Sequence, residues 1–403
     1  MAVSLAVCLP GCSKAEPLRE RERAASAERS PEPIKAQGQP SKPAAAVPGP
    51  VAAALPLAAV LPAAMSPLEP QKPADRLVIV AGGDVNLGRE TGQAILADAT
   101  HAPFRELEPL WGDADLRFVN LESQLSDQNG ETQSPRVRMI FTGPPGGGRT
   151  LAGAGIGVVS TANNHAWDYG RSAFFETLAN LDTAGVLHAG TGRDLDAAYR
   201  PASITLKGWK IAVFAVTHIW NYGPIERHAG RNHVAWARFE ALRPFLRRAR
   251  AEHDVVLVSY HGGGEYMDAP VFGTVRFYRE LMRAGVDAVI GHHPHVVQGV
   301  GWFDGRPGFY SLGNLVFGPR PEHPWTRFGM LARLELERGG ARRYTICPIG
   351  FRVMEPRPLD GDELARERAT FHEYFRGVSR AVGATLIGEP DARGCASIAP
   401  APL

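Results

Sequence analysis

Short runs of β-branched and apolar residues recur along the chain from residue 77 onward, and segments with helical periodicity separate them. The strand-like runs are 77–81, 116–119, 158–160, 211–216, 255–258 and 288–290, and the main helical candidates are 172–184, 238–252 and 275–284. Short apolar runs bounded by glycine and other turn residues are typical of buried strands. Their alternation with helices predicts an α/β fold in which both faces of a sheet are covered.

The last part of the folded region has a different pattern. Runs at 308–312, 329–336 and 344–349 are separated by glycine-containing turns, which predicts the hairpins of a second sheet. Residues 362–382 have the pattern of an amphipathic helix. After Gly383 the tail shows little pattern.

Composition excludes some classes of protein and leaves others open. With 403 residues, 44% hydrophobic and 21% charged, the chain can bury a large core. Its 44 Lys+Arg against 42 Asp+Glu leave no basic excess, so we expect no nucleic-acid partner. The four cysteines, Cys8, Cys12, Cys347 and Cys395, have spacings that match neither a zinc knuckle nor a disulfide framework. Any metal would therefore be held by nitrogen and oxygen ligands.

The N-terminal region predicts export. Residues 1–12 form an apolar stretch that ends at Cys12 and resembles the end of a bacterial lipoprotein signal, although it is short and has no basic start. A true start codon further upstream would explain the truncated look. Residues 13–74 are rich in Pro and Ala without sustained periodicity, which predicts a disordered tether to a lipid-anchored Cys12 in the cell envelope. The alternative is an N-terminus of no consequence.

Polar side chains that suit metal ions lie at or just beyond the ends of five predicted strands. They are Asp84, Glu122, Asn164 with His165, His261, and His293 with His295. In open α/β sheets the ligand site lies past the carboxyl ends of the strands, and all of these residues have that position. Five such clusters are hard to explain as polar residues satisfied within a core.

Taken singly, most of these residues also have a structural interpretation. Asp84 could hydrogen-bond its own glycine-rich turn, and Asn164 could cap a loop. A lone His261 could equally be structural. Glu122, at the mouth of a buried strand, must be either paired or coordinated.

The segment around Pro294 carries the strongest signal for a metal. It places His292, His293 and His295 within four positions, and its proline stiffens the turn. Together with the carboxylates and amides upstream, these imidazoles predict two divalent ions, with Mn, Zn and Fe as candidates, bridged by one carboxylate. Such a pair clamps the oxygens of an electrophile and lowers the pKa of a water molecule, as metal-assisted hydrolysis requires.

The motifs, in this order, resemble the CapA family, also known as poly-gamma-glutamate synthesis proteins, which is related to the calcineurin-like metallophosphoesterases. The motifs are GDVNLGR at 83–89, NLES at 120–123, ANNHAWDYG at 162–170, HAGTG at 188–192, the segment 290–298, and YSLGNLVF at 310–317. The resemblance covers roughly 77–351. It implies a metallophosphatase-like four-layer sandwich of two mixed β-sheets flanked by helices at 75–358, followed by a C-terminal helix and tail at 359–403.

The resemblance also implies a role for each site residue. Asp84 would bind one metal, Glu122 would bridge both, Asn164 and His261 would bind the second, and His293 and His295 would divide between the two. The candidate catalytic residues are His165, which would stabilise or protonate the leaving group, and Arg89. Arg89 could hold an anionic substrate group by bidentate hydrogen bonds, or it could equally form an ordinary ion pair.

Two departures from the phosphoesterase and family patterns affect the predicted site. Asn86 stands where those phosphoesterases have a histidine, so the first metal would bind weakly or through water. Gly262 stands where the family usually has Trp, although Glu265 is retained, which changes the expected substrate pocket. We assign Asn86, Glu265 and Asn314 to substrate binding.

These observations predict an exported protein that synthesises or remodels an anionic capsule polymer of the poly-gamma-glutamate type. Its chemistry would be metal-dependent hydrolysis or transfer at a phosphoester or a gamma-glutamyl amide. Its partners would be the polymer or its precursor and a membrane capsule synthase or exporter. The alternatives are a non-catalytic, polymer-binding accessory of that synthase and a general periplasmic metallophosphoesterase.

Overall fold

The computed structural model describes residues 75–383 and 385–402. The predicted lipoprotein signal at 1–12 and the predicted tether at 13–74 lie outside the described residues. Within the described part of the chain, no helix combines the length and apolar character needed to cross a membrane.

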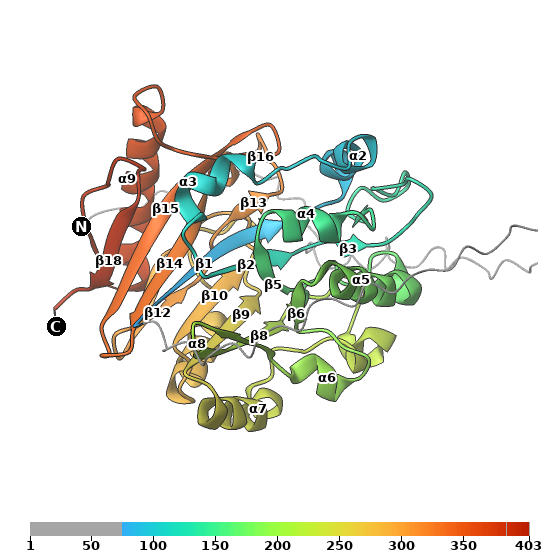
Figure 1. Ribbon diagram of the computed structural model, residues 1–403, viewed down its shortest axis with the longest axis horizontal. Helices are drawn as coiled ribbons and strands as arrows, with labels where there is room; N and C mark the ends of the chain where they lie inside the picture. Colours follow the sequence, from blue (N-terminus) through green and yellow to red (C-terminus); the bar gives the residue numbers. More distant parts are fainter. Residues whose placement is uncertain (1–74, 384, 403) are drawn as a thin grey trace, which may run out of the picture. The chain divides into compact units, whose positions relative to one another are not determined.

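Two large mixed sheets lie at the centre of the folded unit (Figure 1). In the order in which they pair, the strands of the first sheet are β17 (Thr385–Ile387), β18 (Ala396–Pro400), β15 (Arg342–Arg352), β14 (Gly329–Glu337), β1 (Arg76–Val85), β2 (Leu116–Leu121), β5 (Ile156–Ser160) and β6 (Leu187–Ala189), with β13 (Asn314–Val316) beside β1 and β16 (Glu355–Pro358) beside β15. From β1 to β6 the pairs are parallel, and from β1 toward β18 they are antiparallel.

The second sheet is parallel in its middle and antiparallel at both edges. Its order is β11 (Val300–Phe303), β12 (Arg306–Phe309), β10 (Ala288–His292), β9 (Val255–His261), β8 (Trp209–Thr217) and β7 (Ala202–Leu206). A short parallel pair, β3 (Gln124–Leu125) and β4 (Thr142–Gly143), lies apart from both sheets.

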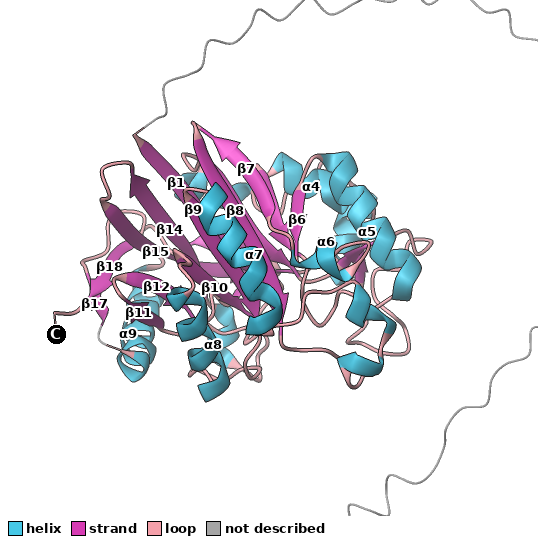
Figure 2. Ribbon diagram, turned by 90° about the horizontal axis from the view of Figure 1, so that it is seen from below, coloured by secondary structure: helices cyan, strands magenta, loops and turns pink. Residues whose placement is uncertain are grey.

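Helices cover the outer faces of both sheets. The helices are α2 (Arg89–Ala97), α3 (Glu108–Trp111), α4 (Gly147–Gly153), α5 (Gly170–Ala184), α6 (Leu195–Tyr199), α7 (Phe239–Glu252), α8 (Phe272–Arg283) and α9 (Ala365–Val382), and the 3-10 turns are η1 (Arg105–Leu107), η2 (Ile225–Arg227), η3 (Ala229–Asn232) and η4 (Pro324–Arg327). In Figure 2, α7 lies in front of β8 and β9 of the second sheet, while α4 and α5 lie on the right of the picture, beyond β7.

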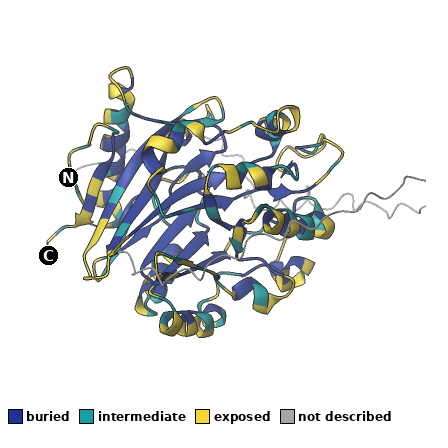
Figure 3. Cartoon of the chain, viewed as in Figure 1, coloured by how far each residue is buried: buried dark blue, intermediate teal, exposed yellow. Residues whose placement is uncertain are grey.

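The alternation of side chains along the strands explains the layers. In β1, Leu77 and Ile79 face the core between the two sheets, whereas Val78 and Val80 face the cluster beneath α2 to α5. Strand β8 divides its side chains in the same way between the central core and the cluster beneath α7 and α8. Figure 3 shows buried strands between helices whose outer surfaces are exposed. The predicted four-layer sandwich of two mixed sheets flanked by helices is therefore confirmed.

One part of the strand prediction was wrong. The hairpin of β14 and β15 was expected in a second sheet, but β14 pairs with β1 and so extends the first sheet. The tail after Gly383, which showed little pattern, contributes β17 and β18 to the edge of the same sheet. Pairing between distant strands is a tertiary choice that a local pattern does not encode.

The cysteine prediction also needs correction. Cys347 of β15 and Cys395 before β18 form a disulfide across 48 residues, with both side chains buried. It links the central part of the first sheet to the C-terminal segment that adds its edge strands. Sequence spacing alone does not reveal the partners of a pairing over this distance.

Candidate metal site

The predicted ligands meet where the two sheets end. Asp84 lies in β1, Glu122 directly follows β2, and Asn164 and His165 lie in the loop after β5. From the second sheet come His261, the last residue of β9, and the segment after β10 that carries His293 and His295. All seven are buried within the protein. The structure thus brings together every residue for which the sequence predicted a metal-ligand role, and His165 with them.

Glu122 lies at the centre of this cluster. Its Oε1 atom is buried and has no hydrogen-bond partner. It lies 3.7 Å from His295 Nε2, 3.8 Å from His261 Nε2 and 4.0 Å from His165 Nε2. A buried carboxylate oxygen without a hydrogen bond is costly unless it is paired or coordinates a metal. The donor set around it therefore fits a metal ion.

Two groups of ligand atoms share this carboxylate. Glu122, His261 and His293 form one group, and Asp84, Glu122 and His295 form the other, with all atoms of a group within 4.8 Å of one another. Asn164 Oδ1 is 2.8 Å from His261 Nε2, so it belongs beside the first group. These groups could hold a metal ion, and their composition is nitrogen and oxygen only.

Residues behind the ligands fix their orientation. The amide of Asn120 donates to Asp84 Oδ1 at 2.8 Å and lies 3.2 Å from His261 Nδ1. Asn163 in turn donates to Asn120 Oδ1 at 3.2 Å. Asn314, predicted to bind substrate, instead lies 2.9 Å from His295 Nδ1. Hydrogen bonds of this kind set the ring orientation of a metal ligand.

Two of the histidines have unusual backbone geometry. His293 has φ +96° and His295 has φ +57°, a region that side-chain-bearing residues seldom adopt. The His293 N–H donates to Asp84 Oδ2 at 3.1 Å, which connects the second sheet to the first. Strain of this type concentrates at functional sites.

Burial sets the protonation of the cluster. Desolvation lowers the pKa of His293 and His295 to about 4, and it lowers the pKa of His261 well below its usual value. Desolvation and the nearby charge of Asp84 raise the pKa of Glu122 well above its usual range. The imidazoles are therefore neutral near pH 7, which is the form that binds a metal.

Asp84 behaves differently from Glu122. Burial acts to raise the pKa of Asp84, but the close contact with His292 and, to a smaller extent, the charges of His295 and His261 outweigh it, so that the pKa is lowered. His292 Nδ1 lies 3.3 Å from Asp84 Oδ1. His292 was seen in the sequence but given no role, and its contact with Asp84 identifies it as a supporting residue.

His165 is held by partners that the sequence analysis did not single out. Its Nδ1 lies 2.8 Å from Asp168 Oδ2, and its ring stacks on Phe141 at 4.2 Å. Asp168 also accepts hydrogen bonds from Tyr222 Oη at 2.6 Å and from the Phe141 N–H at 3.0 Å. This carboxylate fixes the ring so that Nε2 faces Glu122.

The remaining predicted residues lie at the margin of the cluster. Asn86 is buried, and its Oδ1 accepts from the Gly88 N–H at 2.7 Å, so its oxygen stabilises the turn that precedes α2. Glu265 is exposed but has an oxygen within 4.8 Å of ligand atoms of His293 and His295. Arg89 forms no ion pair with any described residue, and its guanidinium lies 4.4 Å from the Phe141 ring.

The fold and the site define a class: a two-sheet α/β protein with a buried carboxylate and imidazole cluster able to hold metal. The model of the family described as bacterial capsule synthesis protein PGA_cap matches residues 78–319. The chain belongs to this family, as the resemblance of its motifs predicted.

Relatives of known name agree with this assignment. The chain is 28% identical to the PGA biosynthesis protein CapA of Bacillus subtilis over 288 residues, covering 71% of this chain and 74% of the relative. It is 24% identical to the capsule biosynthesis protein CapA of Bacillus anthracis, covering 71% and 70%. An NAD nucleotidase structure from Haemophilus influenzae matches 74% of this chain and 62% of its own length, with 10% identity and a TM-score of 0.39, which is too weak to indicate a function.

Proposed function

We propose that this protein is a metal-dependent hydrolase or transferase in the synthesis of a capsule polymer of the poly-gamma-glutamate type. The observation that carries the proposal is Glu122 Oε1, buried without a hydrogen bond and within 4.0 Å of three imidazole nitrogens from three separate segments. The family membership and the names of the relatives supply the polymer.

In this proposal the residues divide the work. Asp84 and His295 would hold one ion, His261, His293 and Asn164 would hold another, and Glu122 would contact both; Mn, Zn and Fe all suit these donors. Bound metal would polarise the oxygen of the electrophile and lower the pKa of a water molecule. His165, oriented by Asp168, would donate a proton from Nε2 to the leaving group of a phosphoester or a gamma-glutamyl amide.

A metal assay of the full chain tests this proposal. Protein purified without chelator is expected to contain two transition-metal equivalents, and His293→Ala should lose at least one of them together with turnover. The control is His101→Ala, which changes a histidine outside the cluster and should retain both. Absence of metal in the wild type, even after loading with Mn or Zn, would contradict the proposal.

The choice between electrophiles requires a substrate comparison. Activity confined to gamma-glutamyl peptides supports the capsule role, whereas turnover of simple aryl phosphates alone supports a general periplasmic metallophosphoesterase. Both substrates should be tested with His165→Ala, because loss of the proton donor slows departure of a poor leaving group more than that of a good one.

A second candidate function has one observation in its favour. Asn86, at the position where the resemblance expects a histidine, uses its oxygen to accept a hydrogen bond from the Gly88 N–H in the turn before α2. The group around Asp84 thus has one imidazole fewer than the related phosphoesterases. A non-catalytic accessory that binds polymer beside a membrane synthase or exporter would tolerate this loss. Finding a single tightly held metal with no turnover of either substrate would favour this accessory role.

We also propose that the protein is exported and anchored through a lipid on Cys12. The buried disulfide between Cys347 and Cys395 supports export, because disulfides persist in oxidising compartments. Fractionation of cells that express the full chain tests the anchor: the wild type should sediment with membranes and Cys12→Ala should not. Equal distribution of the two proteins would contradict it.

A further inference from the structure

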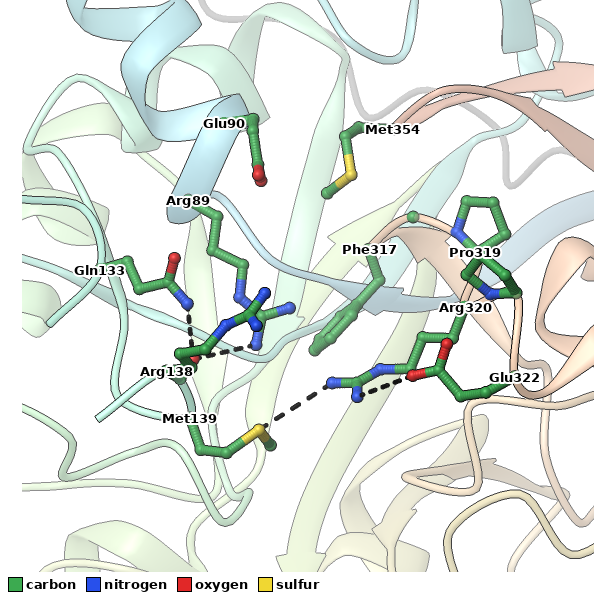
Figure 4. Close-up of a pocket in the computed structure, with 12 residues that line it drawn as sticks. Arg89, Glu90, Gln133, Arg138, Met139, Phe317, Pro319, Arg320, Glu322 and Met354 are labelled. Atoms are coloured by element: carbon green, nitrogen blue, oxygen red, sulfur yellow. Dashed lines mark hydrogen bonds and ion pairs between the residues drawn. The ribbon is translucent and has the colours of Figure 1, made fainter. Parts of the chain in front are cut away.

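An open cavity of about 460 Å³ is lined on one side by Phe317, whose ring contacts the predicted metal ligand His295, and arginines dominate the charge of the cavity (Figure 4). Arg89 enters it from α2, Arg138 from the loop before β4, and Arg320 from the loop after β13. Glu90 and Glu322 also line it, so the arginines outnumber the acidic residues. The volume lies within the range of small-ligand pockets.

Among the residues that the structure describes, no carboxylate forms an ion pair with Arg89 in this cavity. Arg89 makes one long hydrogen bond from Nη2, 3.5 Å, to the Arg138 carbonyl, and its buried Nε has no hydrogen-bond partner. Its backbone adopts φ +52°, and desolvation together with the charge of Arg320 lowers its pKa. The planar guanidinium group binds carboxylates and phosphates by paired hydrogen bonds. Arg89 is partly buried beside the like charge of Arg320, so an anionic ligand would stabilise it.

Two aromatic rings connect Arg89 to the cluster. The Arg89 guanidinium lies 4.4 Å from the Phe141 ring, which stacks on the His165 ring at 4.2 Å and also contacts the Phe317 ring. The guanidinium also lies 5.5 Å from the Phe317 ring, which is 4.5 Å from His295. Because Phe317 lines the cavity, a ligand there would be one ring away from a predicted metal ligand.

We propose that this cavity binds a free carboxylate of a gamma-linked glutamate chain and so places the neighbouring amide at the metal cluster. The inference rests on the proposed function, and it assigns Arg138 and Arg320 to substrate recognition together with Arg89. In a gamma-linked chain every residue keeps one α-carboxylate, so a regularly repeated monoanion is available to the guanidinium groups.

The lining suits a carboxylate that carries an apolar stem. With Glu90 and Glu322 present, the three arginines leave only a small positive excess, which a single carboxylate matches. Met139, Met354 and Phe317 provide apolar surface for the methylene groups that separate the carboxylate from the gamma amide. Figure 4 shows Phe317 between the guanidinium groups of Arg89 and Arg320, where it can contact such a stem.

Binding of defined oligomers to the full chain tests the proposal. Fluorescence anisotropy at fixed salt would compare a labelled gamma-linked glutamate pentamer with the same pentamer carrying α-carboxamides. Arg89→Gln and Arg320→Gln should each weaken pentamer binding about 10- to 100-fold, the effect expected for loss of a charge-assisted hydrogen bond. The pentamer affinity of Arg89→Lys should lie between that of these variants and that of the wild type, because lysine keeps the positive charge but cannot form bidentate hydrogen bonds.

A matched control comes from the same loop as Arg138. Arg136 is exposed and does not line the cavity, so Arg136→Gln should bind the pentamer within about two-fold of the wild type, since single surface charges contribute little. Unchanged metal content in every variant would show that the cluster and the fold are intact.

Three outcomes would overturn the inference. The first is equal affinity for the carboxamide pentamer, and the second is unchanged pentamer affinity in Arg89→Gln and Arg320→Gln. The third is displacement of the pentamer by inorganic phosphate at a lower concentration than by free glutamate. That result would identify the cavity as a phosphate site. Failure of the proposed function is a separate result: His293→Ala would then keep metal and turnover, whatever the pentamer binding.

Discussion

The two sheets contribute chemically different halves of the site. The first sheet and the loop after β5 supply oxygen ligands, namely Asp84, Glu122 and Asn164, whereas the second sheet supplies imidazoles, namely His261, His293 and His295. Each group of three ligand atoms around Glu122 takes members from both sheets. Neither sheet carries a complete site, so the site exists only when the central core holds the sheets in register.

The halves also differ in how their charge is supported. Burial keeps the imidazoles of His261, His293 and His295 neutral. Asn120 donates to Asp84, Asn163 donates to Asn120, and Asn314 Oδ1 accepts from His295 Nδ1. His165 is the exception, because it is an imidazole from the oxygen half and is held by the carboxylate of Asp168. This contrast separates residues suited to bind metal from one suited to transfer a proton.

Removal of the shared carboxylate should have the largest effect. Glu122→Ala takes one ligand from both groups, and we expect metal affinity to fall by more than about 100-fold, beyond the loss typical of supporting residues. Metal analysis after dialysis measures this. Glu265→Ala is the matched control, because Glu265 is exposed at the edge of the cluster and should cost less. Equal losses in the two variants would contradict a bridging role for Glu122.

Acidification should weaken the imidazole half of the metal-free protein. Because the pKa values of His293 and His295 are lowered to about 4, the unfolded chain takes up protons first, so stability falls as pH drops from about 6.5 toward 4. The pKa of Glu122 is raised in the folded protein, so its contribution to stability falls as pH rises above the usual pKa of a glutamate. Urea unfolding in chelator, compared between the wild type and the double variant His293→Ala/His295→Ala, isolates the histidines.

In this comparison the wild type is expected to lose on the order of 6 kcal/mol more than the double variant between pH 7 and pH 4, roughly 3 kcal/mol for each histidine. If the free energy of unfolding depends on pH equally in both proteins, the imidazoles of His293 and His295 are not desolvated, and this prediction is wrong.

The disulfide offers a way to perturb the first sheet without touching the site. Replacing both Cys347 and Cys395 with Ala should lower the free energy of unfolding by about 2–4 kcal/mol, because the unfolded chain regains the freedom of a 48-residue loop. Metal content of the folded variant should stay unchanged. Loss of metal at full folding would mean that the ligand geometry depends on the far end of the sheet.

The smallest effects are expected from substitutions of Asp168 and Tyr222, the residues that orient His165. Asp168→Asn should lower turnover about 10- to 100-fold and leave metal content intact, because it removes the carboxylate that orients the ring. Tyr222→Phe removes only one hydrogen bond to Asp168 and should cost less than about ten-fold. A pH profile of turnover separates this positioning role from a structural one, since its acidic or basic limb should shift in Asp168→Asn.

The strands and the ligand set could be predicted because both depend on local pattern. The run at 255–258 is apolar and ends at a polar cluster, and the structure has β9 ending at His261. Partners that come from distant segments carry no such pattern. Tyr222 reaches Asp168 from the loop between β8 and η2, and Arg138 and Arg320 come from loops without periodicity. The pairing of β14 with β1 is likewise set by tertiary packing.

The backbone at His293 has a practical consequence. Its φ of +96° suits glycine better than alanine, so His293→Gly should fold with less strain than His293→Ala while leaving a ring-sized space beside Glu122. Imidazole added to the medium could enter that space as a free ligand. Restoration of turnover in His293→Gly, but not in Glu122→Ala, would make chemical rescue a direct assay of one coordination position.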